Sequence, residues 1–346
     1  MQKIKLLGFL KEDIPKKLRK QLHELLLEFE LETSKLPSTI NFVRETFEAY
    51  LPSEIEEFWV FPYIEDEMVG FGYCDQQIKF ENLDKGYIRL FVKKNHRRKT
   101  IASKMLKFLL DKTRKQVTSI SIMAFEGSAG EAFLTKFHGK LVFTEKMIVS
   151  NTTDFAGQEI IGLVKDFTEK TSANGYEIKF IPQTELLELT DDLQFVKMIE
   201  RSWNAMPRED KNEEDVVLTK TRLKESYSYR IKRGDEYHTV IALHNETKAL
   251  AGYTITRVNK NLPEIGYQHD TGVLSEYQGN RLGLTMKYHL LQHLKNNTSV
   301  IYWETGSAAS NVYMGKINII LKHKPLKTKL VFEFSKEKLL ESVANK

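Results

Sequence analysis

A short polar loop between a strand-like run and a helix-like run holds the residues best suited to bind an anion. The run Gly266–Leu274 precedes the loop, which reads Gln278-Gly279-Asn280-Arg281-Leu282-Gly283. Glycine lets the backbone approach a ligand closely, and the free N–H groups at a helix N-terminus attract negative charge. The loop therefore predicts a phosphate cradle, to which Gln278, Asn280 and Arg281 would add hydrogen bonds. A tight strand-to-helix turn without a ligand would show the same pattern.

The same order of elements occurs twice along the chain, 181 positions apart. At this offset Val92 corresponds to Val273 and Ala102 to Gly283, and a polar loop precedes a helix-like run in each copy. Similarity at a domain-sized period indicates duplication of one unit. We therefore expect two tandem copies of one fold, with the loop common to both.

The elements that position these loops alternate between strand and helix patterns. After an opening hairpin, strands and helices follow in turn, which favours an α/β (α+β) mixed sheet with helices on both faces. The polar stretch Asp166–Gly175 is the best linker candidate, so we expect an N-terminal domain at 1–168 and a C-terminal domain at 176–346. The main strands are expected at Phe58–Ile64, Met68–Tyr73, Tyr87–Val92, Ser119–Ala124, Leu141–Val149, His238–Leu243, Ala249–Thr256, Gly266–Leu274, Ser299–Glu304 and Lys329–Phe334.

The composition is that of an ordinary globular protein. The chain has 346 residues, of which 41% are hydrophobic and 29% charged, and no apolar run reaches membrane-spanning length. Cys74 is the only cysteine, so an intrachain disulfide is impossible and a reducing, cytoplasmic location is expected. The net charge of +5 is compatible with anionic ligands and does not demand nucleic acid. No membrane partner is expected, and the oligomeric state stays open.

Two motifs in the second copy resemble those of the GNAT superfamily of N-acyltransferases. The first is Thr271-Gly272-Val273-Leu274 followed by Tyr277–Leu284, which is similar to the acetyl-CoA loop of that superfamily. The second is Ser310-Asn311 with Met314 three residues after the asparagine, at the expected distance along the chain. The tandem arrangement looks like the two-domain bacterial branch that includes relatives of mycothiol synthase.

The resemblance implies that acetyl-CoA is the co-substrate and that a primary amine of a small molecule or peptide is the acceptor. It implies that the backbone of Val273 and Leu274 pairs with the pantetheine arm, and that Asn311 lies near the acetyl end. The pyrophosphate would be held by the N–H groups of Gly279, Asn280, Arg281, Leu282, Gly283 and Leu284, beside Gln278.

The catalytic residues are less well defined than the binding loop. His269 and Tyr267 are expected to share a face of their strand with Thr271, and His269 is the first candidate for a base because it titrates near neutrality. The superfamily's usual glutamate is absent near Tyr267, which leaves Glu264 and Glu304 as the nearest acids in sequence. The usual tyrosine acid is replaced by Asn318, so Tyr302 or Tyr313 would have to reach the sulfur.

The first copy has lost several of these residues. At the fixed offset Gly130 stands where Asn311 does and Phe137 where Asn318 does, which predicts a non-catalytic copy. The basic run Lys93–Lys99 is compatible with CoA phosphates, with a solvated loop, or with nucleic acid. Whether this copy binds CoA is left open.

Two features of the sequence allow interpretations other than an acyltransferase: a non-catalytic binding module and a metal site. Loss of the acid and of the strand glutamate is compatible with a non-catalytic acyl-CoA-binding or interaction module. His289 and His293 have the i, i+4 spacing of metal ligands, but the same pair on an amphipathic helix is more simply a surface feature, and no metal site is predicted.

Overall fold

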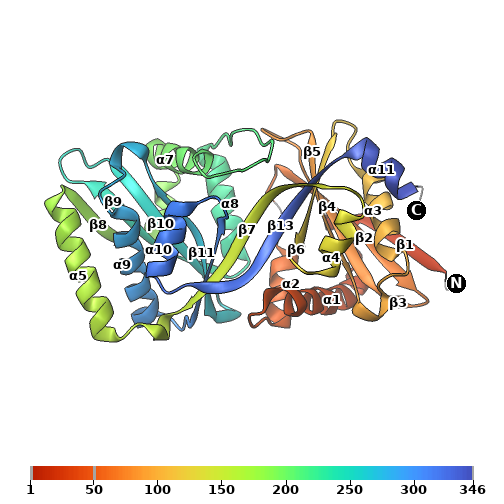
Figure 1. Cartoon of the computed structure of the whole chain (residues 1–346), viewed down its shortest axis with the longest axis horizontal. Coiled ribbons are helices and arrows are strands. Elements are labelled where there is room, and N and C mark those ends of the chain that lie inside the picture. The colour runs from red at the N-terminus through yellow and green to blue at the C-terminus, as the bar shows by residue number, and fades with distance from the viewer. Residues whose placement is uncertain (1–2, 50–51, 345–346) are drawn as a thin grey trace. The chain divides into compact units, whose positions relative to one another are not determined.

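The computed structural model describes residues 3–49 and 52–344, which form two compact units (Figure 1). Unit 1 comprises Met1–Glu145, Arg208–Glu214 and Lys327–Lys346, and unit 2 comprises Lys146–Pro207 and Asp215–Leu326. Within each unit the strands pair in both parallel and antiparallel fashion and helices cover both faces, which confirms the predicted α/β fold class.

In unit 1 the strands are ordered β1-β2-β4-β5-β6-β13, with β3 paired to β2. Only β5 and β6 run parallel; the other neighbours are antiparallel. The strands are β1 (Ile4–Leu10), β2 (Ile55–Ile64), β3 (Glu67–Met68), β4 (Gly70–Gln77), β5 (Lys85–Val92), β6 (Ser119–Phe125) and β13 (Lys324–Ser335), and the helices are α1 (Lys16–Ser34), α2 (Ile40–Glu48), α3 (Ile101–Lys112), α4 (Ala129–Thr135) and α11 (Lys336–Ala344).

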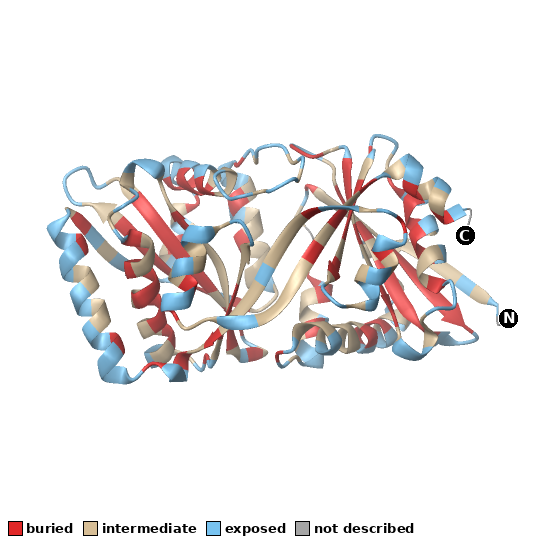
Figure 2. Ribbon diagram, in the orientation of Figure 1, coloured by how far each residue is buried: buried red, intermediate tan, exposed pale blue. Residues whose placement is uncertain are grey.

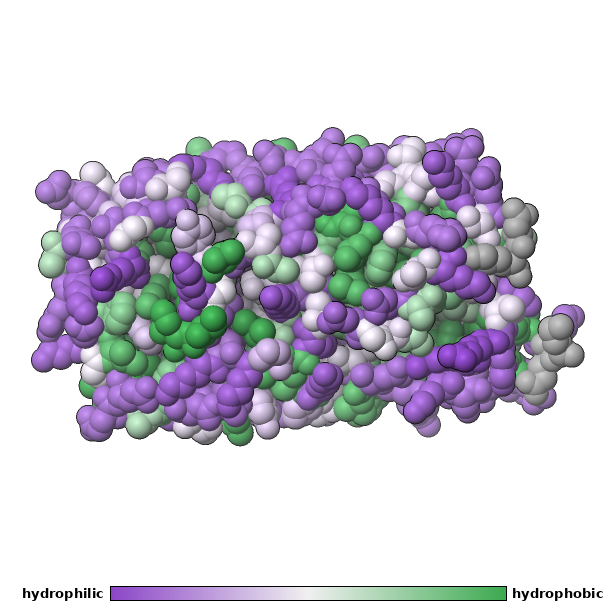
Figure 3. All heavy atoms as spheres, in the orientation of Figure 1, coloured by the Kyte–Doolittle hydropathy of each residue, from purple (hydrophilic) through white to green (hydrophobic). Residues whose placement is uncertain are grey.

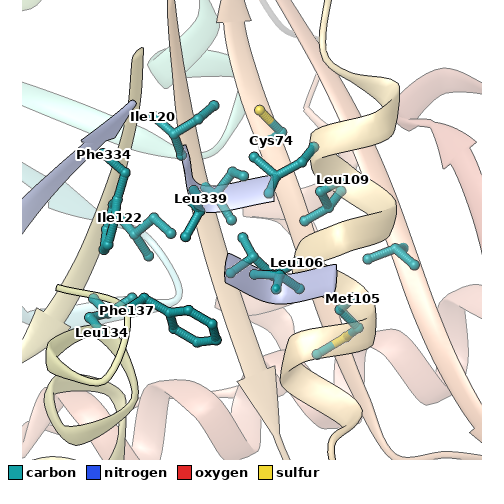
Figure 4. Packing of buried hydrophobic residues seen from close by; sticks show 14 of the residues in the cluster. Cys74, Met105, Leu106, Leu109, Ile120, Ile122, Leu134, Phe137, Phe334 and Leu339 are labelled. Carbon is teal, nitrogen blue, oxygen red and sulfur yellow. The ribbon is translucent and has the colours of Figure 1, made fainter. Parts of the chain in front are cut away.

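Alternation along the strands builds two cores in unit 1, one on each face of the sheet. In β2, Val60 and Ile64 pack with α3 and α11, whereas Trp59, Phe61 and Tyr63 pack with α1 and α2. Successive side chains of a strand point to opposite faces, so one strand supplies both cores. Figure 2 shows buried strands between helices whose outer faces are exposed. Figure 4 shows the first core, in which Leu339 lies near Leu106 and Ile120.

In unit 2 the strands are ordered β8-β9-β10-β11-β12, and β11 and β12 are the parallel pair. Helices α5 and α9 cover one face, and α6, α7 and α8 cover the other. The elements are α5 (Gly157–Ala173), β8 (Tyr176–Ile181), α6 (Gln183–Leu189), α7 (Leu193–Asn204), α8 (Lys220–Lys232), β9 (Asp235–His244), β10 (Leu250–Asn259), β11 (Leu262–Val273), α9 (Leu282–Asn297), β12 (Tyr302–Ala308) and α10 (Val312–Ile320).

The compact units differ from the two sequence segments expected at 1–168 and 176–346. The last strand, β13, pairs with β6 of unit 1, and α11 packs on α3, so the C-terminal segment completes the first unit. The strand β7 (Lys140–Asn151) carries the chain from unit 1 into unit 2. The expected linker at Asp166–Gly175 is not a linker. Most of it is the last part of α5, whose Ile160 and Phe167 pack in unit 2.

Within the described residues, none of the helices combines the length and the apolar character needed to cross a bilayer.

Because β13 closes the first core, loss of a β13 side chain should loosen unit 1. Phe334 is buried with Cys74 in this core, and Phe334→Ala is expected to destabilise unit 1 by about 3–5 kcal/mol. Cys74 is 1% exposed, and burial raises the pKa of its thiol, so its reaction with a thiol reagent reports opening of unit 1.

A thiol reagent should modify Cys74 faster in Phe334→Ala than in the wild type. Ile161→Ala, at an exposed position of α5, is the control; equal rates in all three proteins would contradict the assignment.

Candidate active site

A β-bulge in β11 gives the candidate site its shape. The register with β10 pairs Asp270 with Ile255 and Gln268 with Thr256, so His269 is an extra residue without a partner across the ladder. The amide of Gln268 holds the bulge, donating from Nε2 to the carbonyl of Ile255 (2.8 Å) and to that of Asp270 (2.7 Å). An extra residue on one strand locally reverses the alternation of side chains.

The bulge brings His269 and Asp270 together. His269 Nδ1 lies 2.6 Å from Asp270 Oδ2, and Trp203 Nε1 donates to the same oxygen over 2.9 Å. Burial raises the pKa of Asp270, but His269, Trp203 and Arg230 outweigh burial and lower it below its usual value. Asp270 is therefore an ionised carboxylate that orients the imidazole through Nδ1. This leaves Nε2, to which no described residue is hydrogen-bonded, as the proton-accepting nitrogen.

The bulge also corrects one expectation from the sequence. Thr271 does not share a face with His269; its hydroxyl lies 2.8 Å from that of Thr254 and accepts from Gln268 Nε2 (3.3 Å). Strict alternation would place Asp270 on the face opposite His269, so no pattern in the sequence pointed to this carboxylate or to Trp203 as its partner.

Strands β11 and β12 separate after Tyr267, two residues before His269. Their parallel pairing covers Ile265–Tyr267 on β11 and Tyr302–Glu304 on β12, and the register does not continue past Glu304. Backbone groups of β11 that face β12 after this point have no ladder partner in β12, and an amide-rich ligand can bond to such an edge. Glu304, 6% exposed, is the last β12 residue in the pairing.

The loop after β11 has the form of a cradle. A 3₁₀ turn at Ser275–Tyr277 is followed by Gly279 with φ 85° and Arg281 with φ 62°, and α9 begins at Leu282. No side chain caps α9, so its first N–H groups are available to a ligand. Glycine suits the positive φ at position 279.

The polar side chains of this loop do not all face a ligand. Gln278 Nε2 donates to the carbonyl of Val273 (3.2 Å), and Asn280 Nδ2 donates to the hydroxyl of Tyr176 and the carbonyl of Tyr277 (both 3.1 Å). These two amides therefore fix the loop, while the exposed Arg281 has no such bond in the loop.

The second motif lies at the start of α10. Asn311 is the N-cap of this helix, and its Oδ1 accepts from the N–H of Met314 over 3.1 Å. The three-residue spacing between Asn311 and Met314 is therefore that of a helix N-cap and the backbone N–H that it accepts from. Tyr313, on the first turn, is 83% exposed. Figure 3 shows apolar surface where α10 lies in Figure 1, in keeping with exposed Val312, Ile319 and Ile320.

A buried polar cluster that the sequence did not predict lies beneath α10. Lys287 of α9 is 1% exposed, and burial lowers the pKa of its ammonium to about 7. Its Nζ lies 5.3 Å from the ring centroid of Trp303, whose ring is 5.5 Å from that of His323. Both polar atoms of Asn318 are buried without a hydrogen-bond partner in the described residues. Such groups are costly in an apolar core.

The first copy keeps the cradle geometry with different residues. Its 3₁₀ turn at Lys94–His96 is followed by Arg98 and Thr100, with φ 60° and 61°, and α3 starts uncapped. Arg97 Nε donates to the carbonyl of Val92 over 2.9 Å, as Gln278 does to Val273. The loop conformation is thus preserved without glycine.

The fixed offset does not hold outside this loop. Gly86 pairs with Ile120 in the parallel ladder of unit 1, and Gly266 pairs with Trp303 in that of unit 2. Equating the two ladders gives an offset of 180 for the first strand (Gly86 to Gly266) and of 183 for the second (Ile120 to Trp303). The offset between β5 and β11 rises from 180 to 181 at His269, because this extra residue of β11 has no counterpart in β5. The helix N-cap equivalent to Asn311 is Ser128, which accepts from the N–H of Glu131. The correspondence of Asn311 with Gly130 was therefore wrong.

His289 and His293 contact different partners. His289 Nε2 lies 2.7 Å from Thr168 Oγ1, and His293 Nε2 lies 3.1 Å from His238 Nδ1. Burial lowers the pKa of both rings, and the pKa of His293 falls to about 4. The two rings thus serve packing within unit 2.

A splayed parallel strand pair, a cradle and a following uncapped helix are features of acyl-CoA-dependent acyltransferases. The model of the acetyltransferase (GNAT) family matches residues 20–139 and 196–315. The chain therefore belongs to the GNAT family, in two tandem domains, and is an acyltransferase. No curated protein matches the sequence.

Solved structures show the same fold. One is a tandem GNAT protein from the clavulanic acid biosynthesis pathway, with 16% identity, a TM-score of 0.72, and coverage of 96% of this chain and 99% of the other. Another is a GCN5-related N-acetyltransferase from Sphaerobacter thermophilus, with 11% identity, a TM-score of 0.64, and 96% of each chain covered.

The buried lysine predicts a pH-dependent stability. The pKa of Lys287 is about 7 in the fold and 10.5 when unperturbed, so between these values the unfolded state binds more protons and stability rises with pH. Lys287→Met removes the free-energy cost of burying this amine, which is on the order of a few kcal/mol near neutral pH. The Tm of Lys287→Met should exceed that of the wild type most at about pH 7, and the difference should shrink toward about pH 10. Lys316→Met, at an exposed position of α10, should show no such trend; a constant difference for Lys287→Met would contradict the assignment.

Proposed function

We propose that unit 2 transfers an acetyl group from acetyl-CoA to a primary amine of a small molecule or peptide. The observation that carries this proposal is the pairing of His269 with Asp270 at the bulge of β11. The pair lies on the strand that leads into the cradle, next to the point where β11 and β12 separate.

The cradle and the strand edge would hold the donor. The N–H groups from Gly279 to Leu284 would bind the pyrophosphate at the start of α9, with the exposed Arg281 side chain close by. The pantetheine amides would bond to the edge of β11 near Val273 and Leu274, beyond the last β12 pair.

Acetyl transfer then needs a route for one proton. The amine nitrogen attacks the thioester carbonyl, the C–S bond breaks, and the amine proton passes to His269 Nε2, directly or through water. The charge of Asp270 stabilises the imidazolium that forms. The thiolate leaves and takes a proton from solvent. Glu304, buried beside Tyr267, would help to shape this end of the strand, whereas the exposure of Tyr313 supports no catalytic role for it.

We also propose that unit 1 does not catalyse this reaction and that the protein works in the cytoplasm. The lack of a bulge residue in β5 supports the first statement, because no side chain there corresponds to His269. The single buried thiol, Cys74, supports the second.

Acetyl-CoA binding is tested at the cradle. Gly279→Ala places a methyl group where φ is 85° and where no protein atom lies within 4 Å, so the fold should persist while the approach of the phosphate is obstructed. Calorimetry should show binding of acetyl-CoA by the wild type, about tenfold weaker in the variant. Gly175→Ala, at φ 88° and likewise with no protein atom within 4 Å, is the matched control for the strain of a methyl group at positive φ. Absence of acetyl-CoA binding by the wild type would refute the proposal.

The role of His269 is tested by turnover. His269→Ala should lower kcat for CoA release with an accepted amine by about a hundredfold or more, with acetyl-CoA affinity unchanged, because a general base acts in the chemical step. Asp270→Asn should also lower kcat, since the amide cannot stabilise an imidazolium. His138→Asn, on an exposed turn of unit 1 with φ 58°, should leave kcat unchanged. Full activity of His269→Ala would remove this residue from the mechanism.

A further inference from the structure

Unit 1 contains a polar cavity that the reaction proposed for unit 2 does not use. Its volume is about 200 Å³, and it lies over β4, β5, β6 and β13. All of its lining residues belong to unit 1, including two from the segment Arg208–Glu214. The residues that the argument uses are Tyr73, Asp75, Tyr87, Arg89, Lys211 and Glu213.

The strand register places polar side chains in a row across this face of the sheet. Glu57 pairs with Asp75, Asp75 with Tyr87, Tyr87 with Ser121, and Ser121 with Glu333. Directly opposite residues of neighbouring strands share a face. A row of five polar residues on a sheet whose neighbouring positions form an aromatic core is unusual, because burial of polar groups needs partners.

Arg89 provides free donors in this cavity. Its guanidinium lies 5.8 Å from the ring centroid of Tyr73 and makes no hydrogen bond to the described residues. The negative charge of nearby carboxyl groups and the neighbouring phenol raise the pKa of Arg89 despite burial, so it is charged. A guanidinium presents a planar fork of N–H groups that matches a carboxylate.

Asp75 provides a complementary acceptor. Its Oδ1 is buried and has no hydrogen-bond partner in the described residues. Burial and the charge of Glu57 raise the pKa of Asp75 well above its usual value, which favours the protonated form of Asp75 in the free protein. Glu57 is held from the other side by Trp59 Nε1 (3.1 Å) and by Lys11 (3.6 Å).

The segment Arg208–Glu214 covers the cavity and neutralises its own charges. Tyr87 donates to Glu213 over 3.4 Å, and Lys211 lies 3.8 Å from Glu213 and 4.0 Å from the ring centroid of Phe143. Glu214 and Asn82 exchange two hydrogen bonds that dock the segment. Lys329, which also lines the cavity, is paired with Glu145. The groups left for a ligand are therefore the Arg89 guanidinium and the Asp75 carboxyl group.

We infer that this cavity binds a small zwitterion of the amino-acid class, with its carboxylate on Arg89 and its ammonium on Asp75. A single anion would leave Asp75 Oδ1 without a hydrogen bond, and a single cation would leave the Arg89 guanidinium without one. The volume suits a molecule of amino-acid size rather than a nucleotide or a peptide. This inference does not depend on acetyl transfer in unit 2.

Binding of an ammonium group should release a proton. Asp75, protonated in the free protein, becomes a carboxylate when it pairs with the ligand, and the proton passes to solvent. The charged and titratable groups around Asp75 are Glu57 on β2, Tyr73 on β4, Arg89 and Tyr87 on β5, and Lys11. Glu30 of α1 acts on the same Arg89, and Lys211, Glu213 and Lys329 line the cavity.

The experiment is calorimetry of the full chain with each standard amino acid at about 10 mM, in buffers of different ionisation enthalpy. At least one amino acid should bind with proton release, and the corresponding carboxylic acid and amine should each bind more weakly. Asp75→Asn should abolish the proton release, and Arg89→Gln should weaken binding about ten- to a hundredfold. Arg44→Gln, at an exposed position of α2, should bind as the wild type does.

Three results would overturn the inference: no amino acid binds, the isolated acid or amine binds as tightly as the zwitterion, or Asp75→Asn and Arg89→Gln both bind normally. Circular dichroism verifies that each variant is folded. If Arg89→Gln does not fold, Asp75→Asn and the proton release of the wild type still decide.

Discussion

The hydrogen bond between His269 and Asp270 depends on one extra residue in β11. Adjacent residues of a regular strand point to opposite faces, so this pair can meet only where the alternation is broken. Gln268 holds the break by bonding to the backbone on both sides of it, and Trp203 holds the carboxylate from α7. The geometry that distinguishes the second unit from the first thus follows from a local change of register.

The sequence predicted what repeats and what is periodic. It gave the order of strands and helices, the mixed sheets and the position of the cradle, because alternation and helical spacing are local properties of the chain. It could not give the bulge, since a fixed offset of 181 conceals that β11 and β12 are shifted by different amounts. Asp270 and Trp203 were missed for this reason.

Non-local pairing was also beyond the sequence. The run at Lys329–Phe334 was correctly expected as a strand, but nothing in its residues states that its partner is β6, which belongs to the same unit 1 although it lies far away in the sequence. The polar end of α5 looked like a linker because its exposed face dominates its composition, while Ile160 is buried. Lys287 was hidden in an amphipathic pattern, since lysine is the last residue expected in a core.

The two units also differ in how their sites are built. In unit 2 His269 and Trp203 both contact the carboxylate of Asp270 at the bulge, whereas in unit 1 Arg89 and Asp75 line a cavity. The loop of unit 1 has positive φ at Arg98 and Thr100, as the loop of unit 2 has at Gly279 and Arg281. The two units thus share the backbone conformation of the loop although its residues differ.

The pairing of β6 with β13 has a consequence for the order in which the protein is made. The two strands are separated by roughly 200 residues, so a ribosome synthesises nearly all of unit 2 before the last strand of unit 1 exists. Until then the edge of β6 and the apolar face that α11 covers are exposed to water and to other chains. Domains usually fold in the order of synthesis, but here the unit begun first is completed last, and long-range closure of this kind is slow. The nascent first unit is thus an aggregation-sensitive intermediate that a chaperone would protect.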